Sequence, residues 1–328
     1  MMWNRSILLI GSVLIVSVAI GGAETNSPAA SNLDIEYAEH VPLAAKSLML
    51  DAVRVGDRLI VAGERGQIIL SDDLGQSWVQ AEVVPTRATL TSLFALGGRI
   101  WAAGHDSVIL TSADNGNTWT REYFAPDGQQ PVMDLYFRDE DHGIAIGAYG
   151  LMLLTSDGGQ NWEDWAVNEE DDAHLNAIIE IPGGILLIAG EAGNSYRSTD
   201  GGETWEHMSM PYEGSMFGAV LTAESCVLFY GLRGHVMHSC DGGDHWEELQ
   251  TGSEVTLLGA AEQDGKVLFA GNGGVILLYN GDGSFSQHIH SSGVDFAAAL
   301  SLGADRFLLT GEEGTYFYPE ETSGGTAP

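Results

Sequence analysis

Five aspartates and five tryptophans recur at matching positions in this chain, and these residue types could pass for parts of a catalytic site. The aspartates are Asp73, Asp114, Asp157, Asp200 and Asp241, and the tryptophans are Trp78, Trp119, Trp162, Trp205 and Trp246. Two carboxylates about 5–10 Å apart could hydrolyse a glycosidic bond. The sequence contains 46 Asp and Glu among 328 residues, however, so chance pairs of acids are expected and composition alone does not argue for such a site.

The spacing of these residues gives them an architectural role. Each Asp and Trp belongs to one octapeptide, S/T-x-D-x-G-x-x-W, and successive tryptophans lie 41, 43, 43 and 41 positions apart. A fixed period of about 40 residues is typical of an array of supersecondary units. In a tight turn the Asp can accept backbone N–H bonds and the Gly can adopt a left-handed conformation. We therefore interpret the aspartates as residues that stabilise the turns and the tryptophans as residues that pack between neighbouring units.

A second pattern, G-x-x-G, precedes each octapeptide and predicts the fold. Its first glycines fall at positions 63, 104, 147, 190, 231, 271 and 311, with a variant at 104. Short apolar runs on both sides of each glycine turn predict a β-hairpin. One strand before the hairpin and one after the octapeptide make four strands, labelled a to d from the inside outwards. Seven such units predict an all-β protein, a seven-bladed β-propeller with four-stranded antiparallel blades.

The ends of the repeat region predict how the ring closes. The seventh unit ends at residues 316–318 with only three strands, whereas residues 34–41 resemble the d strands of the other units. We expect this N-terminal strand to complete the last blade and to bury Ile35 and Tyr37.

The chain termini predict export. Residues 1–23 have the basic start, the apolar run and the small residues of a secretory signal, with cleavage expected after Ala23. Retention as an N-terminal anchor is the alternative, and no Cys lies near the cleavage site to carry a lipid. Residues 24–33 read as a flexible lead-in, residues 34–318 as the propeller and residues 319–328 as a disordered tail. The expected location is the periplasm, without membrane insertion after signal cleavage.

Charge and motif spacing exclude several classes of partner. The formal net charge of −33 argues against nucleic acid or an anionic membrane as the main partner. The ten histidines show neither H-E-x-x-H nor H-x-x-E-H spacing, and the G-x-x-G turns belong to hairpins rather than to a phosphate-binding loop. The sequence therefore predicts no metal site and no cofactor.

Cys226 and Cys240 are the only cysteines, and they flank one predicted hairpin. Regular pairing would place Cys226 opposite Ser239, which puts Cys240 on the other face of the strand. An irregular hairpin in an oxidising compartment would allow a disulfide. The pattern leaves both outcomes open.

The octapeptide is identified as the Asp-box, or bacterial neuraminidase repeat. Sialidases resemble this chain in these boxes, and in them the boxes lie on the face away from the active site. Sialidases also carry an F/Y-R-I-P motif, and the nearest string here, Tyr136-Phe137-Arg138-Asp139, lacks the Ile-Pro. A glycoside hydrolase of sialidase type, or a carbohydrate-binding lectin, is the alternative function.

The whole repeat region resembles the photosystem II stability/assembly factor family. Ser198 to Trp205, S-T-D-G-G-E-T-W, is similar to the repeat of that family, and the resemblance covers residues 34–318. It implies a non-enzymatic scaffold on the outer side of a membrane. Photosynthetic members carry an arginine patch and a lipid anchor, whereas this chain has 11 Arg in all. Related propellers of non-photosynthetic bacteria imply an accessory role for an inner-membrane complex, such as an exporter of the resistance-nodulation-division type.

The expected partner-binding surface follows from propeller geometry. The b–c turns and the d–a loops share one face, opposite the Asp-box turns. Arg, Tyr and Trp are enriched at binding hot spots. The candidate contact residues on this face are Arg65, Arg87, His105, Tyr149, Trp165, Tyr212 and Arg233.

Overall fold

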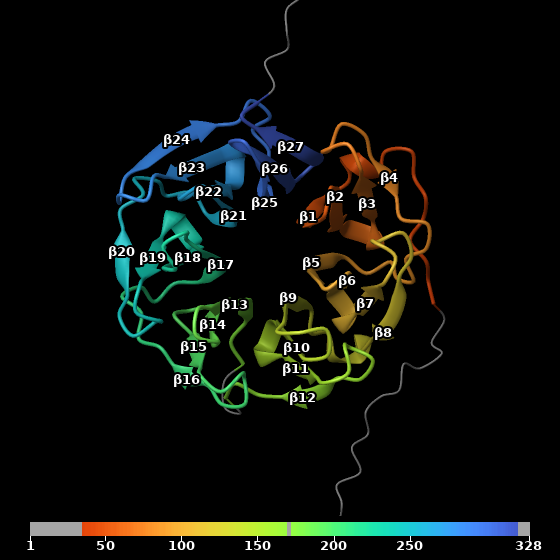
Figure 1. Cartoon of the computed structure of the whole chain (residues 1–328), viewed down its shortest axis with the longest axis horizontal. Helices are drawn as coiled ribbons and strands as arrows, with labels where there is room; N and C mark the ends of the chain where they lie inside the picture. Colours follow the sequence, from red (N-terminus) through yellow and green to blue (C-terminus); the bar gives the residue numbers. More distant parts are fainter. Residues whose placement is uncertain (1–34, 169–171, 321–328) are drawn as a thin grey trace, which may run out of the picture.

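Seven β-sheets surround a central axis like the blades of a propeller (Figure 1). The computed structural model describes residues 35–168 and 172–320. Six sheets contain four antiparallel strands each and the seventh contains three. The seven-bladed propeller predicted from the repeats is confirmed.

The strands follow the chain in order, from the axis outwards within each blade. Blade 1 contains β1 (Met49–Val55), β2 (Arg58–Gly63), β3 (Ile68–Ser71) and β4 (Val79–Gln80). Blade 2 contains β5 (Leu90–Leu96), β6 (Arg99–Gly104), β7 (Ile109–Ser112) and β8 (Thr120–Tyr123). Blade 3 contains β9 (Val132–Phe137), β10 (Gly143–Gly147), β11 (Met152–Thr155) and β12 (Glu163–Trp165). Blade 4 contains β13 (Leu175–Ile181), β14 (Ile185–Gly190), β15 (Ser195–Ser198) and β16 (Glu206–His207).

Blade 5 contains β17 (Met216–Leu221), β18 (Val227–Gly231), β19 (Val236–Ser239) and β20 (Glu247–Leu249). Blade 6 contains β21 (Leu257–Gln263), β22 (Lys266–Gly271), β23 (Val275–Tyr279) and β24 (Phe285–Ile289), and blade 7 contains β25 (Phe296–Gly303), β26 (Arg306–Gly311) and β27 (Gly314–Tyr318). The short 3-10 turns are η1 (Ala44–Lys46), η2 (Glu64–Gly66), η3 (His105–Ser107), η4 (Pro126–Gly128), η5 (Ala148–Gly150), η6 (Leu232–Gly234) and η7 (Asn272–Gly274).

The hydrophobic core is divided among the spaces between neighbouring blades. Between blades 1 and 2, Ile60 and Leu70 pack against Leu93, Leu110 and the box tryptophan Trp119, all buried. Burying one such side chain contributes about 1.5–3 kcal/mol. The b and c strands are buried on both faces, as the continuous burial of β2 and β3 shows, so each blade packs against the blades on either side.

Ring closure differs from the prediction. Within the described residues no fourth strand joins β27, and the segment before η1 lies along the outer side of blade 1. The amide of Ala38 donates to the carbonyl of Val84, and the side chains of Gln67 and Gln80 both donate to the carbonyl of Glu39. The prediction that residues 34–41 complete the last blade is therefore wrong.

Side-chain packing closes the ring instead. Leu59 and Val61 of blade 1 share a buried cluster with Leu302 and Leu308 of blade 7, and Phe317 packs against it. Ile35 and Tyr37, which were expected to be buried, are 41% and 53% exposed. The seam between the first and last blades thus depends on apolar contact rather than on a shared sheet.

The blade 5 hairpin pairs one residue out of step with the expected register. Val227 lies opposite Ser239, so Cys226 stands opposite Cys240. The connection from Gly231 to His235 has an odd number of residues and is closed by a bond from the Gly231 amide to the His235 carbonyl. Cys226 and Cys240 form a disulfide.

The predicted signal segment, residues 1–23, and the lead-in at 24–33 lie outside the described residues, as do positions 321–328 of the predicted tail. In the part of the chain that the structure describes, every helix is too short or too polar to traverse a lipid bilayer.

Candidate protein-binding face

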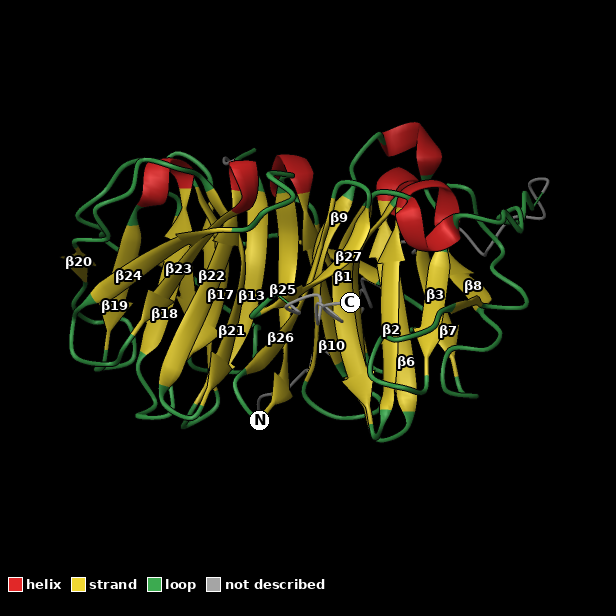
Figure 2. Cartoon of the chain, turned by 90° about the horizontal axis from the view of Figure 1, so that it is seen from above, coloured by secondary structure: helices red, strands yellow, loops and turns green. Residues whose placement is uncertain are grey.

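The two faces of the propeller carry different kinds of turn. The b–c turns, including η2, η3, η5, η6 and η7, lie on one face together with the d–a loops, and Figure 2 shows these short helical turns along one side of the disc. We call this surface the b–c face. The c–d turns formed by the five octapeptides lie on the opposite surface, the Asp-box face.

The tips of the b–c turns hold side chains in an unfavourable backbone conformation. Arg65, Tyr149 and Arg233 have left-handed φ angles of 56°, 56° and 55°, respectively. Blade 6 has Gly273 at the same place, with φ 65°. A left-handed residue other than glycine costs about 1–2 kcal/mol. Three tips therefore present a large side chain where glycine would be more stable.

The arginines of this face are exposed. The side chain of Arg65 is 79% exposed and lies 3.9 Å from the carboxylate of its neighbour Glu64. Arg87 pairs with Glu39 at 2.9 Å, so it also fastens the N-terminal segment. Arg233 is exposed, as is His105 at the start of η3. These arginines stand out on a chain with a net charge of −33.

Blade 3 contributes two exposed aromatic side chains. Tyr149 is 57% exposed, and its ring meets that of His174 edge-on with 4.8 Å between the centroids. Trp165 ends β12 opposite Met152 and is 44% exposed. Large aromatic side chains with this much free surface are typical anchors for a partner.

Tyr212, another of the candidate contact residues, packs against the blade 5 turn. Its ring stacks on that of His235 at 3.7 Å, and the Nδ1 atom of His235 lies 2.7 Å from the Glu248 carboxylate. Tyr212 therefore fastens the d–a loop to the blade 5 turn and is half-buried. The seven candidate residues lie around one face, on turns, loops and the end of β12 in blades 1 to 5, and do not converge on a single described pocket.

The Asp-box carboxylates are fully engaged within their own turns. In the first box, Asp73 Oδ1 accepts the hydroxyl of Ser71 and the amide of Ser77, and Oδ2 accepts the Ser77 hydroxyl. The hydroxyl of Ser71 in turn accepts the amide of Gly75. These hydrogen bonds lower the pKa of Asp73 to about 2.

The other boxes repeat this geometry. Equivalent bonds lower the pKa of Asp200 and of Asp241 to about 2 as well, and they also lower the pKa values of Asp114 and Asp157. Trp119 is buried, and its Nε1–H donates to the Gly116 carbonyl at 3.0 Å. Each oxygen of these carboxylates therefore already accepts a hydrogen bond from its own turn, which orients the turn.

A large cavity opens on the Asp-box face between blades 3 and 4. Its volume is about 760 Å³, with Ile144 and Leu186 among its apolar residues and Glu163, Glu180 and Glu203 among its acids. In blade 1 the corresponding groove is crossed by Arg58, which donates to the Asn115 carbonyl and the Asn117 side chain of the next box.

In blade 3 the residue at the place of Arg58 is His142. Its Nδ1 atom turns back to Asp139 at 2.9 Å instead of crossing to blade 4. The groove therefore stays open.

The sequence patterns did not predict the role of two acids that lie in the central channel. Asp51 accepts the amide of Leu93 from blade 2 at 2.7 Å, and Asp134 accepts the amide of Ile178 from blade 4 at 2.9 Å. Burial raises the pKa of Asp51 to about 7 and that of Asp134 to about 6, against the opposing effect of these amides. Blades 4 to 7 carry only Ala177, Gly218, Gly259 and Ala298 at the same register position.

These channel acids tie blades together. Ser92 of blade 2 also donates to Asp134, so one carboxylate contacts blades 2, 3 and 4. A β-bulge before each residue turns its side chain into the channel. The same bulge occurs in all seven blades, but only two of them have an acid at that position, so the repeat pattern does not reveal these residues.

Comparison with known proteins gives a consistent relationship. A family model described as "Photosynthesis system II assembly factor YCF48" matches residues 122–221. The "Photosystem II assembly lipoprotein Ycf48" of Synechococcus sp. (strain CC9902) is 34% identical over 77 residues, which cover 23% of this chain and 23% of that protein. The protein of the same name from Prochlorococcus marinus is 29% identical over 118 residues, covering 23% of this chain and 35% of the relative. The matches thus span only about a quarter to a third of these relatives.

Solved structures share the fold over most of the chain. "YCF48 bound to D1 peptide" has a TM-score of 0.69 at 19% identity and covers 88% of this chain and 98% of that one. Virginiamycin B lyase from Staphylococcus aureus has a TM-score of 0.72 at 9% identity, covering 83% and 94% of the two chains. At such identities the likeness shows the architecture alone, which an assembly factor and a lyase share. Residues 122–221 are thus similar to the photosystem II assembly factor family, within a propeller fold that proteins of different function share.

Proposed function

We propose that this protein is a non-enzymatic accessory factor that binds a segment of a membrane-protein complex through its b–c face and assists the assembly or operation of that complex. The observation that carries the proposal is that one face presents Arg65, Tyr149 and Arg233, all exposed, at the tips of left-handed turns. Strained backbone positions occur preferentially at functional sites. Two relatives are named as assembly lipoproteins, and one solved structure of a similar protein contains a bound peptide. Both observations support the proposed accessory role.

The proposal also includes a specific partner and a specific location. Export to the periplasm and an exporter of the resistance-nodulation-division type as the partner remain predictions from the sequence. The charge distribution supports a protein partner, because a few exposed cations on an acidic chain can pair with acidic side chains without attracting nucleic acid.

Replacing the three tip residues tests partner binding without lowering the stability of the fold. Arg65→Gly, Tyr149→Gly and Arg233→Gly, combined in one variant, should weaken capture of the partner from detergent-solubilised membranes at least tenfold. The free energy of unfolding should not fall, because glycine removes the left-handed cost of about 1–2 kcal/mol per site. Quantitative pull-down and urea unfolding measure the two effects.

Asn115→Gly supplies the matched control. Asn115 also has a left-handed φ of 58°, but it lies in a box on the opposite face. Its replacement should leave capture unchanged. Equal capture by the triple variant and the unmodified protein would overturn the choice of the b–c face.

Carbohydrate binding or hydrolysis has one observation in its favour. The cavity between blades 3 and 4 offers carboxylates to sugar hydroxyl groups, and Tyr136 donates to one of them, Glu180. This alternative requires glycan binding or glycoside turnover that Glu180→Gln reduces. Saturable binding to a glycan array, lost in Glu180→Gln, would support it over the accessory role.

A further inference from the structure

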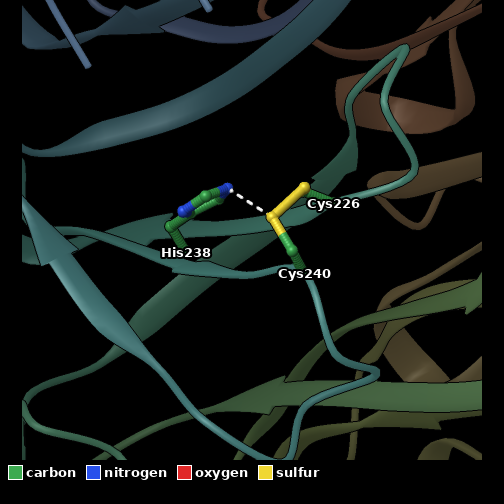
Figure 3. Close-up of side chains that lie close together, drawn as sticks. All are labelled: Cys226, His238 and Cys240. Carbon is green, nitrogen blue, oxygen red and sulfur yellow. Dashed lines mark hydrogen bonds between the residues drawn. A yellow bond between two sulfur atoms is a disulfide. The ribbon is translucent and has the colours of Figure 1, made fainter. Parts of the chain in front are cut away.

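The blade 5 disulfide has a histidine beside it. Cys226 comes just before β18 and Cys240 just after β19, and the register of the hairpin places them directly opposite. The Nε2 atom of His238, two residues before Cys240, lies 3.1 Å from the Cys240 sulfur (Figure 3). One ligand atom from each of these three residues lies within 4.8 Å of the others.

A carboxylate holds the histidine in a metal-binding orientation. The Nδ1 atom of His238 lies 3.0 Å from Glu247 Oε1. An N–H at Nδ1 donating to a carboxylate leaves the lone pair on Nε2, and this pairing is the usual support of a metal-binding histidine. The lone pair of His238 therefore points towards the sulfur atoms.

The surroundings leave room for an ion. Cys226 is buried, whereas Cys240 is exposed, and the side chain of His238 is only 17% exposed. A cavity of about 280 Å³ opens beside His238 and Cys240, with Asp241, His245 and Glu247 in its wall. An ion bound by the three side chains could thus hold a water molecule on its open side.

We propose that reduction of the disulfide converts this corner of blade 5 into a site for a thiophilic d¹⁰ metal ion, with Zn²⁺ as the reference case. The ligands are Cys226 Sγ, Cys240 Sγ and His238 Nε2, and water fills the fourth position. Two thiolates, one imidazole and one water form a tetrahedral set that suits zinc, whose ligand atoms lie about 2.0–2.3 Å from the metal. Neither the family relationship nor the proposed accessory role assigns this site.

Reduction of the disulfide to two thiols requires two electrons and two protons. A dithiol reductant gives two electrons and two protons, the Cys226–Cys240 bond breaks, and the reductant leaves as a disulfide. Zn²⁺ then displaces the two thiol protons as it binds, because thiolate is the ligand form. The disulfide and the metal complex exclude each other, so the redox state of the surroundings decides which is present.

Cobalt provides a direct probe of the site. The full chain, reduced with a phosphine without oxygen, is titrated with Co²⁺ and then with Zn²⁺. The reduced protein should bind one equivalent of Co²⁺, with a thiolate-to-metal charge-transfer band and the visible bands of a tetrahedral ion. Zn²⁺ should displace it, and the oxidised protein should show neither band. Absorption by an unreduced sample equal to that of the reduced one would contradict the proposal.

Single substitutions assign the ligands. Cys226→Ser should abolish the charge-transfer band, and His238→Asn should weaken binding at least tenfold. Glu247→Gln should weaken it by about 10–100-fold, as loss of a carboxylate behind a metal-bound histidine does. The matched control is His235→Asn, since His235 forms a similar pair with Glu248 in the same blade but has no cysteine beside it.

Two further results would refute the site. One is equal affinity in His238→Asn and the unmodified protein. The other is loss of the fold on reduction, checked by circular dichroism and by the Cys226→Ser/Cys240→Ser double variant, because an unfolded hairpin cannot hold the three ligands together.

Discussion

Gly147→Ala is expected to lower the free energy of unfolding by at least about 3 kcal/mol, as strong overpacking of a well-packed site does. A Cβ atom at position 147 would lie 2.1 Å from the carbonyl oxygen of Pro131 and 3.0 Å from the Cα of Val132. The backbone of Gly147 is extended, with φ −171°, so the cost is entirely steric. The carbonyl cannot retreat easily, because it accepts the amide of Ala148 at 3.0 Å.

Gly98→Ala is the matched control for this effect. Gly98 lies in the β5–β6 turn with φ 92°, and a Cβ atom there would meet nothing within 4 Å. Its replacement should cost only the left-handed penalty of about 1–2 kcal/mol. Urea unfolding compares the two variants. A smaller loss for Gly147→Ala than for Gly98→Ala would show that the d–a loops can move away from the b–c turns.

The protein is expected to become less stable as pH rises from 5 to 8. The pKa of Asp51 is raised to about 7 and that of Asp134 to about 6, whereas an unperturbed carboxyl titrates at 3.8. Between these values the folded state binds more protons than the unfolded chain, so the free energy of unfolding falls as pH rises. The expected loss is on the order of 3 kcal/mol, allowing for water that reaches the channel.

The Asp-box acids act in the opposite direction at lower pH. Their folded pKa values of about 2 mean that their contribution is present above pH 4 and disappears as pH falls towards 2. Stability should therefore be greatest near pH 4–5. This is more acidic than the optimum of most proteins, which lies between about pH 5 and 8.

Urea unfolding at several pH values in high salt isolates the channel acids, because salt screens the repulsion between surface charges. Asp51→Asn and Asp134→Asn should each flatten the slope between pH 5 and 8. Asp264→Asn, at an exposed acid in the β21–β22 turn, should leave the slope unchanged. Stability that stays constant or rises over this range would show that the channel carboxyls remain ionised in the folded protein.

The features that the sequence predicted correctly are those set by local pattern. The octapeptide contains the donors and acceptors that shape its own turn, as Ser71, Asp73 and Ser77 show. The repeat of these turns with the G-x-x-G hairpins therefore predicted both the number of blades and the face on which each turn lies.

The features that it missed depend on contacts between distant residues. Residues 35–41 could have joined either end of the ring, and the choice rests on Gln67 and Gln80, whose amides bind the carbonyl of Glu39. The pairing of Cys226 with Cys240 depends on one extra residue in a turn, and the place of Asp51 depends on a bulge. The last two are shifts of a single residue, too small to change a periodic pattern.

The seam between blades 1 and 7 has a mechanical consequence. Every other step around the ring is also made by continuous chain, whereas at this junction Leu59 packs with Leu308, and Arg54 donates to the Leu302 carbonyl. The ring can therefore open at this junction without breaking the hydrogen bonds of any sheet, whereas opening it elsewhere would also stretch the connecting chain.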